Sequence, residues 1–289
     1  MRDVLLYAIL LAKKEGNYSK FNSIEVHSKN SFPTGCGIAS SASGMSAYAL
    51  GLCKIFNLDP EKYCSLLARR GSGSACRSTL GGIVLWDADK RDPEQCVRQL
   101  FDLDHWPELR VILCIVDNIT KKNASTGGMQ DSLRTSKFMK KSRKENAEAN
   151  LKSLVESIEK HDFENFARII MKESNQLHSI CLDTFPPIRY LNESSWTIIN
   201  FVHRINQHFD RTIVAYTFDA GPNAFLICLE SDVDQIIHSL SIVFSKKINH
   251  NFQRPVEDFD FLDNDSSSSP GNLQNIFVCK LGSGTLVIN

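Results

Sequence analysis

The sequence predicts an α+β protein with antiparallel sheets, built from two domains. Short apolar strands alternate with helices, but the segments between them lack the regular spacing of repeated β-α-β units. A length of 289 residues and a hydrophobic content of 42% suit two domains that each bury a core. We place the boundary just before the strongly apolar run RVILCIVD, which gives domains at residues 1–106 and 107–289.

The first domain is expected to be mainly helical. Asp59 and Pro60 form a typical helix start, in which Asp caps the helix and Pro takes its first position, and Gly71 ends that helix. In chain order we predict a helix at 2–14, a strand at 23–29, helices at 40–56 and 60–70, a strand at 82–86 and a charged loop to 104.

The second domain is expected to contain a sheet covered by long helices. In chain order the patterns predict a strand at 110–117, a loop around 125–129, helices at 140–160, 162–178 and 193–208, strands at 212–219 and 224–230, a helix ending near 244, and strands at 275–281 and 284–288. The run DNDSSSSPGN at 263–272 has low complexity and predicts a mobile loop.

The stretch SFPTGCGIASSASG at 31–44 has the composition of a phosphate-binding loop. Glycines let the backbone approach a ligand closely, and a helix starting near residues 39–41 would direct free N–H groups and a positive dipole end toward it. The alternative is an ordinary glycine-rich turn with a serine cap. The candidate phosphate-binding residues here are Gly35, Gly37, Ala39, Ser40 and Ser41.

A second glycine- and serine-rich turn, GSGSACRSTLGG, covers 71–82 and leads into a short helix. Arg77 follows two serines by about one helical turn. Its guanidinium group offers a two-pronged clamp for a carboxylate or phosphate. The alternatives are a flexible linker and an arginine engaged in a surface ion pair.

The segment YTFDAGPNA places Asp219 at the end of a strand, just before a tight turn at 220–223. A carboxylate in this position can be directed into a cleft and act on a substrate hydroxyl. It can equally cap the turn through its own side chain. The spacing alone leaves both interpretations open.

Composition excludes several classes of partner. Lys plus Arg and Asp plus Glu number 33 each, so no net charge favours nucleic acid or an anionic membrane. Nine scattered cysteines are typical of reduced thiols in the cytosol. No apolar run is long enough to span a bilayer, and we interpret the run at 4–12 as a buried helix, with a signal peptide as the less favoured alternative.

Several motifs together resemble one family. SFPTGCGIASSASG, ARRGSGSACRS, HWPELRV, STGGMQDS, KESNQLHSICLDTFPPIRYLN and AYTFDAGPNA are similar to eukaryotic diphosphomevalonate decarboxylases of the GHMP kinase superfamily. The resemblance implies the two-domain GHMP kinase fold: a ribosomal-protein-S5-like first domain and a ferredoxin-like second domain. It also implies a cytosolic homodimer that uses ATP and Mg²⁺ to convert mevalonate 5-diphosphate to isopentenyl diphosphate, ADP, phosphate and CO₂.

The resemblance also implies residue roles. Asp219 would orient or deprotonate the substrate 3-hydroxyl, Arg77 would hold the substrate carboxylate and diphosphate, and Ser41 would position the transferring phosphoryl group. Cys76 lies in the motif but is assigned packing, because no His accompanies it. The residues implied to bind substrate are Ser72, Gly73, Ser74, Ala75, Cys76, Arg77, Thr126 and Arg2.

The chain departs from the family pattern at its start. The family carries a further amino-terminal segment that supplies early strands, an asparagine and a lysine, and an uncovered apolar face is expected without it. Three explanations stay open: an incomplete version of an active enzyme, which we favour, a catalytically weak variant, or a non-catalytic homologue that binds ATP or a diphosphate. Another small-molecule GHMP kinase is a further alternative.

Overall fold

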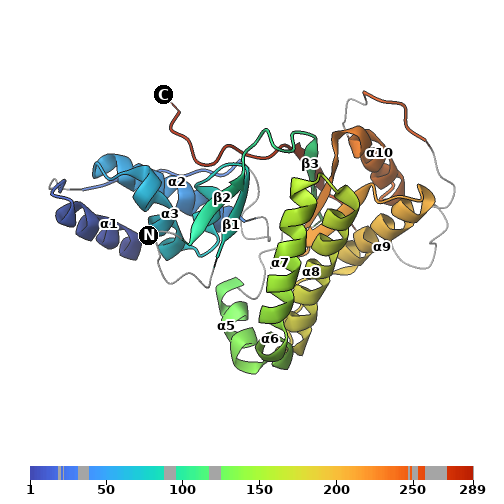
Figure 1. Cartoon of the computed structure of the whole chain (residues 1–289), viewed down its shortest axis with the longest axis horizontal. Helices are drawn as coiled ribbons and strands as arrows, with labels where there is room; N and C mark the ends of the chain where they lie inside the picture. Colours follow the sequence, from blue (N-terminus) through green and yellow to red (C-terminus); the bar gives the residue numbers. More distant parts are fainter. Residues whose placement is uncertain are drawn as a thin grey trace. The chain divides into compact units, whose positions relative to one another are not determined.

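The computed structural model describes residues 1–18, 21, 23–31, 39–87, 96–116, 125–246, 248, 253–257 and 272–288. The chain forms two compact units (Figure 1). The first contains the described residues up to Pro107 together with 281–288, and the second contains Glu108–Lys280. Each unit has its own hydrophobic core. The predicted second domain included 281–288, which the structure instead packs with the first unit.

The first unit is a helical layer with a small hairpin. Its core joins apolar residues of three helices, for example Val4, Leu52 and Leu67. Strands β1 and β2 pair antiparallel. The elements are α1 (Arg2–Lys14), α2 (Ser40–Ile55), α3 (Pro60–Gly71), α4 (Ala75–Ser78), β1 (Ile83–Trp86) and β2 (Val97–Phe101).

Local sequence signals explain where α3 begins. The Asp59 side chain accepts a hydrogen bond from the Glu61 N–H at 3.0 Å, and Pro60 occupies the first helical position. The helix predicted at 60–70 is therefore confirmed, as are the helices predicted at 2–14 and 40–56.

Two strand predictions in this unit were wrong. Residues 23–29 do not form a strand, because they have no hydrogen-bonded neighbour among the described residues. Conversely, β2 lies within a region that was predicted as a charged loop. The strand was missed because its alternation of polar and apolar residues is short and its Arg98 and Gln99 are exposed. A strand exists only where a partner satisfies its backbone groups, and a single segment of sequence does not reveal that partner.

The segment 281–285 packs against the turn between α4 and β1. The Gly82 N–H donates to the carbonyl of Gly282 at 3.0 Å, and the Thr285 hydroxyl donates to the carbonyl of Ser78 at 3.0 Å. Residues 284–288 were predicted to close the sheet of the second domain. That prediction was wrong, because they form no strand and belong to the first unit.

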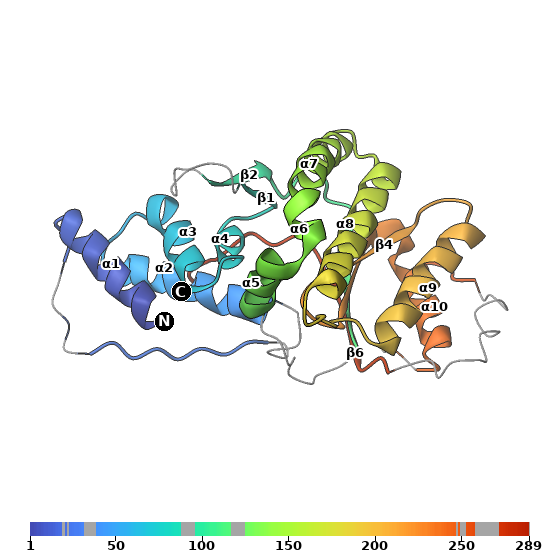
Figure 2. The same ribbon diagram turned by 90° about the horizontal axis from the view of Figure 1, so that it is seen from below.

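The second unit contains a four-stranded antiparallel sheet in the order β4-β5-β3-β6. The predicted antiparallel α+β organisation is therefore confirmed. Figure 2 shows the sheet's helices, α8 and α9 among them, from below. The strands are β3 (Leu109–Ile115), β4 (Val214–Phe218), β5 (Ala224–Leu229) and β6 (Asn275–Cys279).

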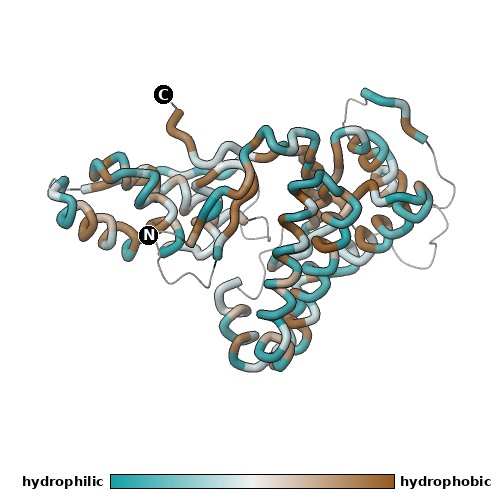
Figure 3. Tube along the Cα trace, viewed as in Figure 1, coloured by the Kyte–Doolittle hydropathy of each residue, from teal (hydrophilic) through white to brown (hydrophobic). Residues whose placement is uncertain are grey.

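Helices cover this sheet, and α8 alternates polar and apolar residues along its length (Figure 3).

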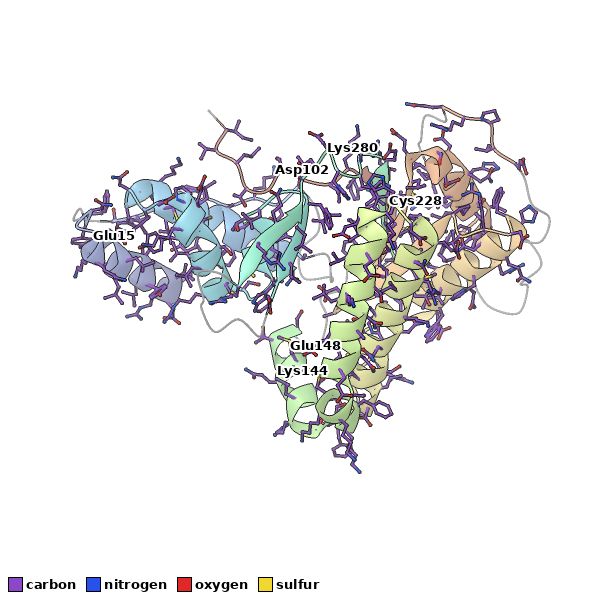
Figure 4. All side chains as sticks on the ribbon, viewed as in Figure 1. Glu15, Asp102, Lys144, Glu148, Cys228 and Lys280 are labelled. Carbon is purple, nitrogen blue, oxygen red and sulfur yellow. The ribbon has the colours of Figure 1, made fainter. Side chains whose placement is uncertain are left out.

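On α7, Lys144 and Glu148 lie one turn apart with their charged atoms 3.7 Å from each other (Figure 4). The helices are α5 (Ser125–Thr135), α6 (Lys137–Lys141), α7 (Arg143–Glu159), α8 (Phe163–Asp183), α9 (Glu193–His208) and α10 (Val233–Val243).

Strand β4 lies at an edge of the described sheet, and side chains of two helices satisfy its outer backbone groups. The Asn206 amide on α9 accepts from the Val214 N–H at 3.2 Å and donates to the Val214 carbonyl at 2.8 Å. Ser174 on α8 accepts from the Phe218 N–H at 3.0 Å. These side chains replace the backbone hydrogen bonds that a neighbouring strand would supply.

The loop predicted around 125–129 is instead the first turn of α5. The glycine pair suggested a loop, but Gly128 faces Tyr190, whose hydroxyl would lie 2.5 Å from an added Cβ. Glycine is therefore explained by close packing at this point. The low-complexity run predicted to be mobile lies almost entirely outside the described residues.

Among the described residues, no helix combines the length and the apolar character needed to cross a membrane.

The 281–285 segment provides a stability test. Gly284 has a positive φ of +84°, and an added Cβ would lie 2.8 Å from the backbone of Leu80 and Thr79. We expect Gly284→Ala to loosen this segment and destabilise the first unit by about 1–3 kcal/mol, because alanine fits neither the conformation nor the space. Urea unfolding measures the loss.

Gly282→Ala is the matched control, because nothing lies within 4 Å of an added Cβ there. Equal unfolding midpoints for the two variants would contradict the tight packing at Gly284.

Candidate functional site

The serine turn, defined as residues 72–77, joins α3 to α4. The Ser72 N–H still donates to the carbonyl of Ala68 at 3.0 Å, and the Ser72 carbonyl accepts from the Ala75 N–H at 2.9 Å. These bonds end one helix and begin the next within a few residues. The turn is thus a fixed structure and not a flexible linker.

Hydrogen bonds around the buried Cys76 hold the serine turn in place. The carbonyl of Cys76 accepts hydrogen bonds from the hydroxyls of Ser65 at 3.1 Å and Thr79 at 2.8 Å. The Cys76 thiol is buried and donates to the carbonyl of Gly73 at 3.0 Å. Burial raises the pKa of this thiol, so it stays protonated and acts as a packing group.

The two glycine- and serine-rich motifs meet through their hydroxyls. Ser41 Oγ and Ser72 Oγ are 3.4 Å apart, and both side chains line a mainly apolar cavity of about 450 Å³. Ser41 lies in the first turn of α2, two residues after Ala39, whose φ of 57° is left-handed. A non-glycine residue in this conformation stores strain, a feature that is enriched at functional sites.

Arg77 is exposed, and its guanidinium lies over the Trp86 ring at 5.7 Å from the ring centre. Gly73 approaches the same ring, which would lie 3.4 Å from an added Cβ. Trp86 on β1 therefore supports both the backbone and the cation of the serine turn. Arg2 is exposed at the start of α1, next to Met1, which lines the cavity.

The acidic turn, defined as residues 219–223, follows β4 in the second unit. Three hydrogen bonds hold this turn. Two involve its backbone: Gly221 N–H to the Asp219 carbonyl at 2.8 Å and the Ser195 hydroxyl to the Pro222 carbonyl at 2.8 Å. The third runs from the Val116 N–H to the side-chain oxygen of Asn223 at 2.8 Å. The Gly221 N–H bonds the main-chain carbonyl of Asp219, so this hydrogen bond of the turn does not use the Asp219 carboxylate. Asp219 itself is exposed.

Three further groups lie within electrostatic reach of Asp219. Burial lowers the pKa of His178, while a backbone hydrogen bond to Phe218 and the Asp219 charge oppose that effect. Burial raises the pKa of Cys181 to about 11, and the Asp219 charge adds to the increase. Burial likewise raises the pKa of Tyr190 to about 12, with smaller effects from Cys181 and Asp219. At neutral pH all three groups are therefore uncharged.

These three residues were not among the predicted site residues. Their motif, HSICLDTFPPIRY, carried the family resemblance, but no spacing rule singled out one member. What distinguishes these residues is the approach of α8 to β4, and only the fold reveals that approach.

Thr126 is exposed in the first turn of α5. Two residues later, Gly128 contacts Tyr190 and Ile188, so α5 is packed close to the Tyr190 ring. Thr126 thus belongs to the same unit as Asp219, whereas Ser41, Arg77 and Arg2 belong to the first unit.

The structure brings together Ser41 and the whole serine turn in the first unit. Gly35 and Gly37 lie outside the described residues. In the part of the chain that the structure describes, no group of three or more His, Cys, Asp or Glu side chains is placed to hold a metal ion. Mg²⁺ typically keeps several waters and binds substrate phosphates with one or two carboxylates, so a Mg²⁺–nucleotide complex does not require such a cluster.

Comparison with known proteins assigns both halves of the chain. Residues 6–97 match the family model of the diphosphomevalonate decarboxylase-like N-terminal domain, and residues 111–288 match the mevalonate 5-diphosphate decarboxylase C-terminal domain. The chain is 40% identical over 278 residues to the diphosphomevalonate decarboxylase of Rattus norvegicus, covering 92% of this chain and 68% of the relative.

Solved structures agree with this assignment. The mevalonate diphosphate decarboxylase from Trypanosoma brucei is 35% identical with a TM-score of 0.78, covering 88% of this chain and 70% of the other. A structure of the protein MDDEF in complex with MVAPP, AMPPCP and magnesium is 26% identical with a TM-score of 0.74, covering 97% of this chain and 76% of the other. The expected GHMP kinase fold is therefore confirmed.

The buried His178 predicts a pH dependence of stability. Its folded-state pKa lies below the ordinary 6.5, so the unfolded chain binds a proton at this site more readily. Stability from this site is therefore present above pH 6.5 and is lost as the pH falls through the lower, folded-state pKa. Urea unfolding at about pH 7.5 and pH 5.5 measures the change.

In His178→Asn this contribution is absent, so we expect a smaller loss of stability between the two pH values. The other seven of the eight histidines are common to both proteins and cancel in the comparison. An identical loss in the parent and the variant would contradict a depressed pKa at His178.

Proposed function

The chain belongs to the diphosphomevalonate decarboxylase family, and on this premise we propose that it catalyses the ATP-dependent decarboxylation of mevalonate 5-diphosphate. The products are isopentenyl diphosphate, ADP, phosphate and CO₂. The observation that carries this proposal is the approach of Ser41 to the serine turn at 3.4 Å, with the exposed Arg77 in the same turn. Two hydroxyls and a guanidinium gathered on one unit suit a multiply anionic ligand.

The reaction explains why these residue types are needed. The tertiary 3-hydroxyl of the substrate is a poor leaving group, so ATP first phosphorylates it. Loss of that phosphate develops positive charge at C3, and the C1 carboxylate departs as CO₂. The chain must therefore hold two anionic groups, align a hydroxyl for phosphoryl transfer and fix the carboxylate that will be lost.

We assign these tasks to the predicted residues. Ser41, at the start of α2, positions the transferring phosphoryl group with its hydroxyl, and the helix N-terminus adds positive potential. Arg77 holds the substrate carboxylate and diphosphate through its paired N–H donors. Asp219 accepts the proton of the 3-hydroxyl or orients it, as an exposed carboxylate on a fixed turn can do.

A solved structure of a relative supports ATP and Mg²⁺ as the co-substrate and metal. MDDEF binds AMPPCP and magnesium together with MVAPP, and this chain has the same fold at 26% identity. When bound, Mg²⁺ would supply neutralisation of phosphate charge. The candidate groups that contact the nucleotide are Gly35, Gly37, Ala39, Ser40 and Ser41.

We also propose that the chain is a cytosolic homodimer. The scattered cysteines are typical of a reducing compartment, and no disulfide joins those that the structure describes. Sedimentation equilibrium of the purified chain tests the oligomeric state, and a monomer at all concentrations would contradict the dimer.

The central experiment incubates the purified chain with ATP and mevalonate 5-diphosphate and measures ADP and CO₂ together. We expect equal amounts of both products. ADP with a C3-phosphorylated product but without CO₂ would instead identify a small-molecule kinase. Calorimetric binding of ATP with neither product would identify a non-catalytic homologue.

Asp219→Asn tests the proposed acid–base role. We expect kcat to fall by about 10²- to 10⁴-fold, the usual contribution of a positioned general base, with ATP affinity unchanged. Asp210→Asn is the control, because Asp210 is another exposed aspartate in a turn of the second unit and Asn tolerates its left-handed φ of 47°. Near-parental activity of Asp219→Asn would remove this residue from the mechanism.

Arg77→Ala tests the proposed anion clamp. We expect the KM for mevalonate 5-diphosphate to rise by about tenfold or more, since a charge-assisted hydrogen bond contributes about 1.5–3 kcal/mol, while the KM for ATP changes little.

Arg70→Ala provides the matched control. Arg70 is also exposed and also lies over an aromatic ring, with its guanidinium 4.5 Å from the centre of the Tyr7 ring. It carries the same charge but lies outside the serine turn. An equal rise in KM for both ligands in Arg77→Ala would argue against a role specific to the diphosphate substrate.

A further inference from the structure

The segment 281–285 bonds both ends of the connecting turn, defined as residues 79–82, that joins α4 to β1. The Thr285 hydroxyl donates to the carbonyl of Ser78, the last residue of α4, at 3.0 Å. The Gly282 carbonyl accepts from the N–H of Gly82, the residue directly before β1, also at 3.0 Å. The segment therefore spans the connecting turn from one end to the other.

Between these two bonds, the segment and the connecting turn touch backbone to backbone. A Cβ added at Gly81 would lie 2.8 Å from the backbone of Ser283. A Cβ added at Gly284 would lie 2.8 Å from the backbone of Leu80. A side chain at either position would push the two segments apart, so the contact needs glycine on both sides. This requirement makes the contact a specific feature of the sequence.

The bond from Thr285 completes the hydrogen bonding at the end of α4. The last carbonyl groups of a helix have no partner within it and must be satisfied from outside. Groups within residues 65–80 satisfy the carbonyls of Cys76 and Arg77. The Ser78 carbonyl instead accepts from Thr285, which lies 207 residues later in the chain. A distant segment thus holds the end of the helix that carries Arg77.

Helix α4 and strand β1 meet at the Trp86 ring. The Arg77 guanidinium lies 5.7 Å from the centre of this ring, and Gly73 approaches it closely. These contacts require α4 to keep its position relative to β1, but the connecting turn contains two adjacent glycines, which restrain the backbone little. Because the segment 281–285 restrains this turn at both ends, it controls where the guanidinium is presented.

We propose that Thr285 is a positioning residue for the anion clamp: by bonding the end of α4, it holds Arg77 where the guanidinium binds the anionic substrate. This inference rests on the proposed role of Arg77 in binding mevalonate 5-diphosphate. The alternative is a purely structural role for the segment, in which substrate affinity does not depend on the Thr285 hydroxyl.

Two substitutions of Thr285 isolate the hydroxyl. Thr285→Val keeps the shape of the side chain but removes the donor, whereas Thr285→Ser keeps the donor and removes only a methyl group. In Thr285→Val we expect the KM for mevalonate 5-diphosphate to rise by about three- to tenfold, the scale of one hydrogen bond, and the KM for ATP to stay within about twofold of the parent. Thr285→Ser should keep both values within about twofold of the parent. Equal KM values for the Val and Ser variants would overturn the proposal.

A double-mutant cycle tests whether Thr285 acts through Arg77. If it does, adding Thr285→Val to Arg77→Ala has no further target, and the KM for mevalonate 5-diphosphate stays within about twofold of that of Arg77→Ala alone. A further rise of the same size as in the parent chain would show that the two residues act independently, and would overturn the proposal.

Asn17→Ala is the matched control for a general loss of stability. The Asn17 amide donates to the carbonyl of Asn57 at 2.8 Å, so it also bonds a carbonyl beside a helix end of the first unit, but outside the serine turn. We expect urea unfolding to show similar losses of stability in Asn17→Ala and Thr285→Val, with a parental KM in Asn17→Ala. A KM raised equally in both variants would assign the effect to loosening of the whole unit and overturn the proposal.

A further measurement does not require turnover. Hydrogen–deuterium exchange at the Gly82 amide, which bonds the Gly282 carbonyl, reports the attachment of the segment. We expect about tenfold faster exchange in Thr285→Val and parental exchange in Thr285→Ser. Parental exchange in Thr285→Val would overturn the proposal. If the parent chain neither binds nor converts mevalonate 5-diphosphate, the proposed function fails, whereas exchange at Gly82 still tests whether Thr285 holds the connecting turn.

Discussion

The position of the acidic turn depends on how the outer edge of β4 is satisfied. An edge strand presents backbone N–H and C=O groups that must find partners. Here the partners are side chains of α8 and α9, which bond the first and last residues of the strand, Val214 and Phe218. The packing of two helices on one strand therefore decides where the carboxylate of Asp219 begins.

In the first unit, the candidate site is built from the ends of helices. The polar groups of this site lie at helix ends, where N–H groups and hydroxyls are available without distorting a helix interior. Ser41 and Ser72 are accessible, while the residues that carry the turn, Ala75 and Cys76, are fully buried. Exposed polar atoms on a rigid, buried backbone are the arrangement that electrostatic preorganisation requires.

Much of this organisation could be predicted from the sequence. Local signals such as the Asp59–Pro60 cap specified helix boundaries, because capping depends on adjacent residues. The serine turn, Arg77 and Asp219 were identified by motifs whose residues are contiguous. The errors arose where long-range partners decide: β2 forms through its pairing with β1, and residues 23–29 form no strand in the absence of a described neighbour. The buried groups near Asp219, among them His178, were missed because the packing of α8 on β4 brings them there, which sequence spacing does not encode.

Trp86 has a further consequence. The chain contains three tryptophans, of which Trp106 is 3% exposed and Trp196 lies on α9 in the second unit. Trp86 is in contact with the serine turn, beneath the Arg77 guanidinium and beside Gly73. Indole emission responds to a nearby cation, so any anion that draws Arg77 away from the ring changes the light that the protein emits. The chain thus contains an intrinsic optical reporter for occupancy of its own anion-binding turn.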